Sequence, residues 1–195
     1  MKKPVLFFSI VLLSYSAFAQ QTKNMDDPQA SFKQARDFFQ NEYYSLAYPI
    51  FRELKYSMRE TDRSNNSVEY QDVKYYYLVC ALEQNDQTAV DPAREFIDLE
   101  NNAPRVGMMA FHLAEYYFRQ KDYTAAVRLY EQADIENLSN KEIADLKFHQ
   151  GYGYFTQQRF DKALPLFDAI RQLPKDPNYI DANYYYGFIC FYQKK

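Results

Sequence analysis

The feature that most constrains the fold of this chain is a pattern that occurs three times along it. The copies are Tyr44-x2-Ala47-x3-Phe51-x2-Leu54, Tyr123-x2-Ala126-x3-Tyr130-x2-Ala133 and Phe160-x2-Ala163-x3-Phe167-x2-Ile170. Steps of three and four residues place these side chains on one face of an α-helix, and the shared alanine lets a neighbouring helix come close. Each copy is therefore predicted to be a helix packed against another helix.

A preceding helix is predicted for each copy. It carries a small residue followed three positions later by an aromatic ring, in the pairs Ala35 and Phe38, Ala114 and Tyr117, and Gly151 and Tyr154. The spacing supports a true repeat, because Ala114 to Gly151 and Ala126 to Ala163 are both 37 residues. No segment alternates with period two over a useful length, so strands are not expected.

These residues resemble the tetratricopeptide repeat, a helix-turn-helix unit of about 34 residues. The best match is Leu113-Ala114-x2-Tyr117-x8-Ala126-x3-Tyr130-x2-Ala133. The resemblance covers residues 28–195 and implies an all-α fold, a right-handed α-solenoid of stacked antiparallel helix pairs with about four and a half repeats. The expected units are 28–58, 67–100, 105–135 and 140–171, followed by a half-unit at 178–195 that contains Gly187.

Two parts of this repeat array are irregular. In the degenerate unit at 67–100 the register is open, because either Cys80 with Ala89 or Ala81 with Val90 could fill the aromatic and alanine positions. Pro49 and Pro165 each follow the repeat alanine by two residues, where proline costs a hydrogen bond or a kink unless the helix begins late.

The first 19 residues have the pattern of a secretory signal peptide. Lys2 and Lys3 precede an apolar run from Val5 to Leu13, which is too short to span a bilayer, and Ala17-Phe18-Ala19 matches a cleavage site before Gln20. With no cysteine near the cut, a lipid anchor is not expected. Residues 20–27 then form a short N-terminal segment, and the product is predicted to be periplasmic or outer-membrane-associated.

Composition narrows the classes of function. With four glycines, two histidines and two cysteines, the chain has little material for a phosphate loop, a metal site or a Cys/His nucleophile pair. After removal of residues 1–19 the formal charge is −5, from 26 acidic and 21 basic residues, which argues against a nucleic-acid partner. We expect no catalytic residues, no metal and no cofactor.

The resemblance implies that the first helices of the units line a concave face that binds partner peptides or helices. Carried onto this sequence, the family's binding positions predict these partner-binding residues: Phe32, Arg36, Phe111, Glu115, Phe118, Phe148, Tyr152, Phe155, Tyr184 and Phe188. Exposed rings of this kind would give an apolar groove. The alternative is that the same rings pack between adjacent first helices as ordinary core.

The histidines and the cysteines are predicted to have no role in a metal site or a disulfide. His112 and His149 lie one repeat apart, too far for a shared metal ion, so surface or edge positions are expected. Cys80 and Cys190 fall three repeats apart, well beyond the roughly 7 Å between Cα atoms that a disulfide spans. Both are predicted to be free thiols in the core.

The expected function is therefore a non-catalytic protein–protein interaction scaffold of the bacterial cell envelope. The helix at Asn183–Tyr192 is apolar on nearly every side, so we expect the array to continue beyond residue 195. Two alternatives are a sensor ectodomain of a larger membrane signalling protein and an auxiliary domain of an envelope enzyme.

Overall fold

The computed structural model describes residues 27–59 and 68–194, and all the regular structure in these two ranges is helical. The prediction of an all-α fold is confirmed. The expected signal peptide at 1–19 lies outside the described residues, as does nearly all of the segment 20–27. The elements are α1 (Pro28–Gln40), α2 (Tyr44–Ser57), α4 (Val68–Glu83), the 3-10 turn η1 (Gln87–Ala89), α5 (Val90–Leu99), α6 (Ala103–Arg119), α7 (Tyr123–Tyr130), the 3-10 turn η2 (Ile135–Asn137), α8 (Asn140–Thr156), α9 (Phe160–Ile170) and α10 (Tyr179–Gln193).

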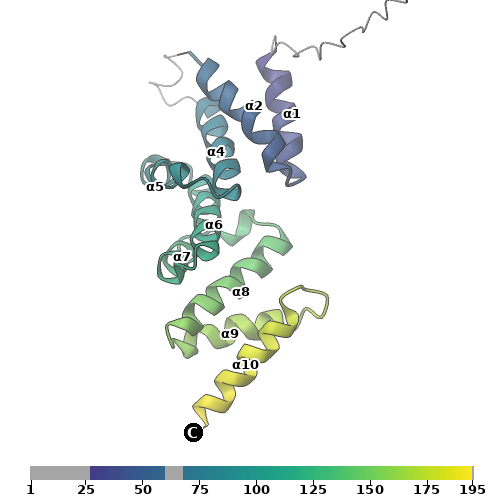
Figure 1. Cartoon of the computed structure of the whole chain (residues 1–195), viewed down its shortest axis with the longest axis vertical. Helices are drawn as coiled ribbons and strands as arrows, with labels where there is room; N and C mark the ends of the chain where they lie inside the picture. The colour runs from purple at the N-terminus through teal and green to yellow at the C-terminus, as the bar shows by residue number, and fades with distance from the viewer. Residues whose placement is uncertain (1–26, 60–67, 195) are drawn as a thin grey trace, which may run out of the picture.

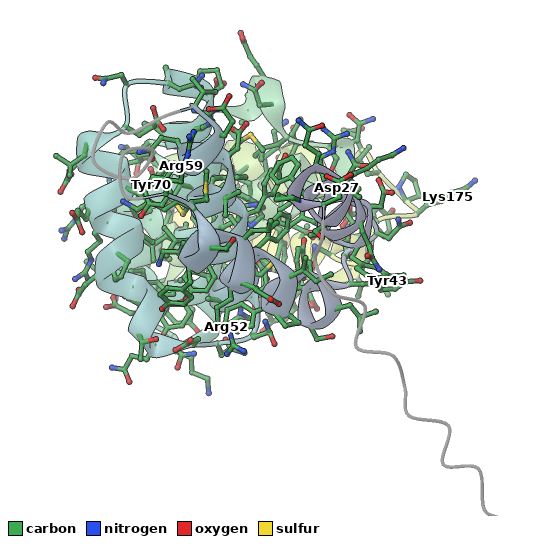
Figure 2. All side chains as sticks on the ribbon, turned by 90° about the horizontal axis from the view of Figure 1, so that it is seen from above. Asp27, Tyr43, Arg52, Arg59, Tyr70 and Lys175 are labelled. Carbon is green, nitrogen blue, oxygen red and sulfur yellow. The ribbon has the colours of Figure 1, made fainter. Side chains whose placement is uncertain are left out.

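The helices follow one another along the longest axis of the molecule, from α1 and α2 at one end to α10 at the other (Figure 1). Helix α1 packs on α2, α2 on α4, α4 on α6, and the same order continues through α7, α8 and α9 to α10. Seen along that axis, Arg52 and Lys175 lie at the periphery (Figure 2). Most contacts therefore join elements that are close in sequence.

Four turns between helices share one backbone geometry. Each contains a non-glycine residue in the left-handed region, and these residues are Glu42, Asn85, Lys121 and Gln158, with φ between 59 and 64°. In each turn the next residue donates its N–H to a carbonyl five residues earlier, as Tyr43 does to Phe38 and Asp122 to Tyr117. The bond caps the last turn of the first helix, whose carbonyls have no partner within the helix.

This shared turn decides the register of the degenerate unit. The N–H of Asp86 donates to the carbonyl of Ala81 at 3.0 Å, as Asp122 does to Tyr117. Asn85 also lies five residues before Val90, just as Lys121 lies five residues before Ala126. Ala81 and Val90 therefore fill the positions that an aromatic ring and an alanine fill in the other units.

The small residues of the repeat lie where helices meet. Ala35, Ala47, Ala114, Ala126 and Ala163 are all buried, as is Gly151. Gly187 in α10 differs, because it is exposed and a Cβ atom added to it would meet nothing within 4 Å.

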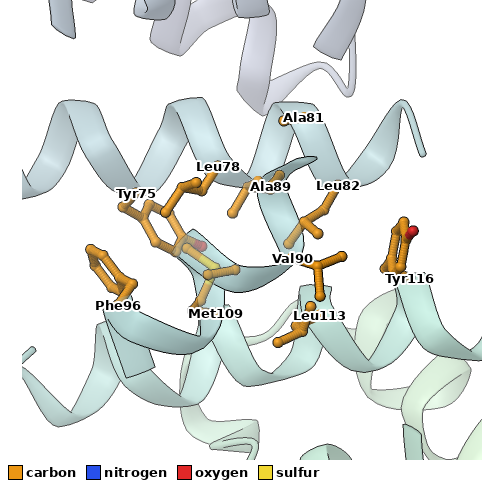
Figure 3. Packing of buried hydrophobic residues seen from close by; sticks show 12 residues of the cluster. Tyr75, Leu78, Ala81, Leu82, Ala89, Val90, Phe96, Met109, Leu113 and Tyr116 are labelled. Atoms are coloured by element: carbon orange, nitrogen blue, oxygen red, sulfur yellow. The ribbon is translucent and has the colours of Figure 1, made fainter. Parts of the chain in front are cut away.

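The apolar core is a series of clusters rather than one centre. The cluster drawn in Figure 3 joins α4, α5 and α6 through Tyr75, Leu78, Phe96, Met109 and Leu113, all buried. Similar clusters lie between α1, α2 and α4, between α6, α7 and α8, and between α8, α9 and α10. Burial of these side chains stabilises each contact between neighbouring helices.

Pro49 and Pro165 lie inside their helices. Helices α2 and α9 begin at Tyr44 and Phe160, five residues before each proline, so neither helix begins late. Proline has no N–H, so the carbonyls of Ser45 and Asp161, four residues before each proline, each lose a helical hydrogen bond.

Candidate functional site

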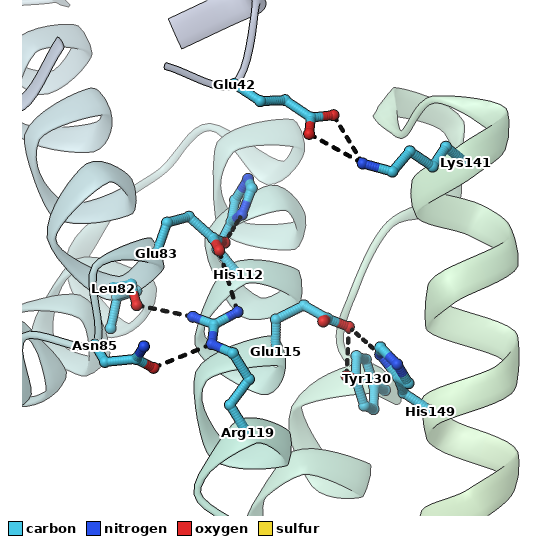
Figure 4. A network of polar contacts seen from close by, with 10 residues as sticks. All are labelled: Glu42, Leu82, Glu83, Asn85, His112, Glu115, Arg119, Tyr130, Lys141 and His149. Atoms are coloured by element: carbon cyan, nitrogen blue, oxygen red, sulfur yellow. Dashed lines mark hydrogen bonds and ion pairs between the residues drawn. The ribbon is translucent and has the colours of Figure 1, made fainter. Parts of the chain in front are cut away.

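The first helices α4, α6 and α8 are joined on one side by a network of polar side chains (Figure 4). Glu83, in the last turn of α4, accepts hydrogen bonds from two residues of α6. Its Oε1 atom lies 3.0 Å from Nδ1 of His112, and its Oε2 atom lies 3.1 Å from Nη1 of Arg119. Arg119 also donates to Asn85 and to the carbonyl of Leu82. Arg119 thereby makes hydrogen bonds to three residues at the C-terminal end of α4.

The next first helix repeats this arrangement with a different carboxylate. Glu115 of α6 has Oε1 2.8 Å from Nδ1 of His149 on α8. The same atom accepts the hydroxyl hydrogen of Tyr130 from α7 at 2.5 Å. His112 and His149 are 37 residues apart and thus hold the same repeat position, each facing a glutamate of the preceding first helix.

Burial and neighbouring charges shift the pKa values of several side chains in this network. Burial alone would raise the pKa of Glu83, but the hydrogen bonds and charges of His112 and Arg119 outweigh it and hold that pKa below its usual value. Burial raises the pKa of Asp145 on α8, although His149 and Lys141 oppose the rise. Burial and the Glu115 carboxylate raise the pKa of Tyr130 well above its ordinary value, so Tyr130 is a hydrogen-bond donor.

An ion pair joins two helix ends that are far apart in the sequence. Lys141, in the first turn of α8, donates to both carboxylate oxygens of Glu42 at 2.9 and 3.0 Å. Glu42 lies in the turn between α1 and α2, and the two residues are 99 positions apart in sequence. Both side chains are mostly exposed, so the pair contributes little stability. The pair nevertheless places the turn between α1 and α2 beside the first turn of α8.

Beyond His149 the polar network gives way to a line of aromatic rings, here called the aromatic row: Phe118, Tyr152, Phe155, Tyr185 and Phe188. The centroids of Phe118 and Tyr152 lie 5.9 Å apart, and those of Tyr152 and Tyr185 lie 5.3 Å apart. Phe155 contacts Tyr185 at 4.9 Å and Phe188 at 5.4 Å. These edge-to-face and tilted contacts link α6, α8 and α10. The first four rings are half-buried and Phe188 is exposed.

The ten predicted partner-binding residues fall into three groups. Arg36, Tyr184 and Phe188 are exposed. Phe32, Glu115, Phe118, Tyr152 and Phe155 are half-buried, and the last three belong to the aromatic row together with Phe188. Phe32 lies apart from them in a pocket of about 410 Å³ between α1, α2 and α4.

The remaining two predicted partner-binding residues follow the alternative, in which such rings pack as core. Only 4% and 7% of the surfaces of Phe111 and Phe148 are exposed. Phe111 shares a cluster with Tyr130 and Leu146, and Phe148 packs on Phe167 and Tyr185. Each ring fills the angle between its own second helix and the following first helix, so these two positions are core.

The prediction of surface or edge histidines was wrong for His112 only. His112 is buried rather than at the surface, and His149 is half-buried and stacks on Phe118 with the ring centroids 4.0 Å apart. The residues missed from the sequence are Glu83, the partner of His112, and Tyr130, which donates its hydroxyl hydrogen to Glu115. The common position of the two histidines in the repeat was the signal that could have indicated a shared structural role.

The cysteines are free thiols, as predicted. Cys80 is fully buried in the cluster of α1, α2 and α4, while Cys190 on α10 is only half-buried. The prediction of a core position is therefore correct for Cys80 but not for Cys190. Burial raises the pKa of the Cys80 thiol to about 12.

Comparison with known proteins does not place the chain in a family. No protein-family model matches it, and no curated protein matches it. Within residues 27–59 and 68–194, no group of three or more His, Cys, Asp and Glu side chains could hold a metal ion. No helix in the described part of the chain combines the length and apolar character needed to cross a bilayer.

Proposed function

We propose that this chain is a non-catalytic scaffold that binds other proteins in a bacterial cell envelope. Binding would use the inner face of the first helices α1, α4, α6, α8 and α10. The proposal takes the fold as a right-handed α-solenoid of the tetratricopeptide type with about four and a half repeats. The four matching turns and the buried repeat alanines support it.

The observation that supports a binding surface is the aromatic row. Its rings are held in place by one another, so few side-chain rotamers would have to be fixed when a partner binds. They are nevertheless incompletely covered, and half-exposed rings beside polar groups are typical anchors of protein interfaces. The network of Glu83, Glu115 and the two histidines would keep α4, α6 and α8 at fixed spacing beneath such a partner.

Binding to immobilised chain tests the proposal. Envelope proteins captured by the wild type would be identified, purified singly and titrated against wild type and Phe155→Ser. Phe155 contacts four other rings, so a melting curve must show that most of the variant remains folded. We expect at least a tenfold loss of affinity.

The matched control is Tyr56→Ser, which removes an exposed ring of α2 that lies outside the aromatic row. It should bind like the wild type. Equal affinity of wild type and folded Phe155→Ser for every captured partner would contradict binding through the aromatic row.

The proposed location depends on residues 1–19 and has its own test. Intact-mass analysis of the protein from the envelope fraction should give a chain that begins at Gln20. A chain that retains Met1 would contradict export by this route.

A further inference from the structure

Helices α2 and α4 carry a group of basic and aromatic side chains where they pack together. This group, here called the α2–α4 patch, consists of Tyr48, Arg52 and Lys55 of α2 with Lys74 and Tyr77 of α4. The rings of Tyr48 and Tyr77 stack with their centroids 5.3 Å apart. Nζ of Lys55 lies 4.4 Å from the centroid of Tyr77, and Cζ of Arg52 lies 5.7 Å from that of Tyr48. One pair of rings therefore holds two cations beside it.

The α2–α4 patch is open to solvent. Arg52 is exposed and lies at the periphery of the molecule in Figure 2, and the other four side chains are half-buried. Steps of four and three residues put the three members on α2 on one face of that helix, and a step of three does the same for the two on α4. A partner that lies across the two helices can therefore contact both rings and all three cations.

The three cations of the patch have no carboxylate partner within residues 27–59 and 68–194. Other basic side chains do have one, as Arg119 has Glu83 and Arg171 has Asp168. Burial lowers the pKa of Lys55, and the positive charge of Lys74 lowers it further. A bound anion would oppose both effects.

Two acidic side chains near the patch do not neutralise it. Glu53 directly follows Arg52, so it lies about 100° further around the axis of α2. Burial and Tyr48 raise the pKa of Tyr77 most, and the charge of Asp86 adds to the rise. The Oδ1 atom of Asp86, however, already accepts hydrogen bonds from the N–H and the hydroxyl of Thr88 at 2.9 and 2.7 Å. The patch is thus a local excess of positive charge.

We propose that the α2–α4 patch binds an acidic segment of another polypeptide in an extended conformation. Alternate side chains of an extended segment lie on the same side, about 7 Å apart. The axes of packed helices are about 8–10 Å apart, so carboxylates at alternate positions can reach cations on both helices. This surface is separate from the aromatic row of α6, α8 and α10, and it goes beyond the function proposed above.

The net charge of the chain favours a short anionic segment over an extended anionic surface. After residue 19 the chain has 26 acidic and 21 basic residues, a formal charge of −5. An anionic bilayer would also face acidic residues around the patch, and charges within about 8 Å are not screened at physiological salt. A short acidic segment contacts the patch alone.

Fluorescence anisotropy with the full chain tests the proposal. The probe is a labelled, end-capped peptide of about eight residues in which glutamate and serine alternate, long enough to span both helices. We expect a dissociation constant on the order of 100 µM at about 20 mM salt, because each exposed ion pair contributes little. Binding should be at least tenfold weaker at about 0.5 M salt. The same peptide with glutamine in place of glutamate should not bind measurably.

The double variant Arg52→Gln/Lys55→Gln should bind the acidic peptide at least tenfold more weakly. The matched control is Arg128→Gln/Lys175→Gln, which makes the same change of charge at exposed residues of α7 and of the segment before α10. This control should bind almost as tightly as the wild type. Circular dichroism of both variants would show that lost binding does not reflect lost helix.

Three outcomes would overturn the proposal. One is a wild-type chain that does not bind the acidic peptide at low salt, and another is equal weakening in both double variants. The third is a wild type that binds vesicles of anionic phospholipid but not the peptide, since the patch would then be a membrane-binding surface. Phe155→Ser should bind the acidic peptide like the wild type, so failure of one binding surface does not affect the test of the other.

Discussion

One oxygen atom of Glu115 contacts both His149 and Tyr130. Nδ1 of His149 lies 2.8 Å from it, and the hydroxyl of Tyr130 donates to it at 2.5 Å. Since these residues belong to α6, α8 and α7, a single carboxylate connects three helices.

Glu115→Gln should lower the free energy of unfolding by about 1–3 kcal/mol, because hydrogen bonds to a charged acceptor are stronger than those to an amide. Urea unfolding at pH 7 measures the change. The exposed Glu95 of α5 provides the control, and Glu95→Gln should unfold like the wild type. Identical unfolding of both variants would mean that the Glu115 contacts add no net stability.

The lowered pKa of Glu83 predicts a dependence of stability on pH. Burial raises this pKa, yet His112 and Arg119 lower it below the ordinary value of 4.5. A carboxyl group with a lowered pKa in the folded state contributes stability above its unfolded pKa. That contribution is lost as the pH falls through the folded pKa. The stability difference between wild type and Glu83→Gln should therefore be largest near pH 7 and shrink below pH of about 4.5. A difference that stays constant down to pH 3 would contradict this assignment.

Overpacking a repeat alanine should be costly. Ala126 is buried between α6 and α7, so Ala126→Leu is expected to destabilise the protein by about 1–3 kcal/mol. Thermal melts would measure this against Gln132→Ala, an exposed change a few residues away that should be nearly neutral. Unchanged melting of Ala126→Leu would show that α7 can move away from α6 at little cost.

The two buried phenylalanines should behave as core residues. Phe111→Ala and Phe148→Ala are each expected to cost about 3–5 kcal/mol, as is typical of truncating a buried ring. Tyr184→Ala provides a control at the same repeat position, because that ring is 65% exposed. It should change stability by less than about 0.5 kcal/mol. Similar losses of stability in all three variants would contradict the burial of Phe111 and Phe148 relative to Tyr184.

The two thiols should differ in the native protein. Cys190 is half-buried and should react readily with a thiol reagent, whereas Cys80 is fully buried, and burial raises its pKa to about 12. One thiol per chain should titrate quickly under native conditions and two after denaturation without reductant. Fewer than two thiols in the denatured chain would reveal a disulfide.

The local pattern predicted the helix pairs because its signal lies within a few residues. The spacing of Ala126 and Tyr130 fixes one helical face, and a partner helix is close in sequence. The positions of Phe111 and Phe148 could not be predicted in the same way. A ring at that position lies at the boundary between the inner face and the following first helix, and the side on which it packs depends on how neighbouring helices cross.

The polar network could not be predicted, because its residues are far apart in the sequence. His112 pairs with Glu83, 29 positions earlier, in a unit whose register was open because Ala81 and Val90 replace the usual residues. The hydrogen bond from Asp86 to Ala81 and the left-handed residue Asn85 fixed that register. The exposed glycine at 187 likewise has the same residue type as the buried Gly151, and sequence pattern alone does not distinguish a covered position from an uncovered one.

The four left-handed turns at Glu42, Asn85, Lys121 and Gln158 offer a way to measure cooperativity. A side chain in this conformation costs about 1 kcal/mol or more relative to glycine, although less for asparagine. Lys121→Gly would therefore stabilise one helix pair, whereas glycine at Glu42 or Asn85 would also remove the contact with Lys141 or Arg119. If hydrogen exchange slowed only in that pair, the pairs would open independently. If it slowed in all of them, opening of one pair would require opening of the rest.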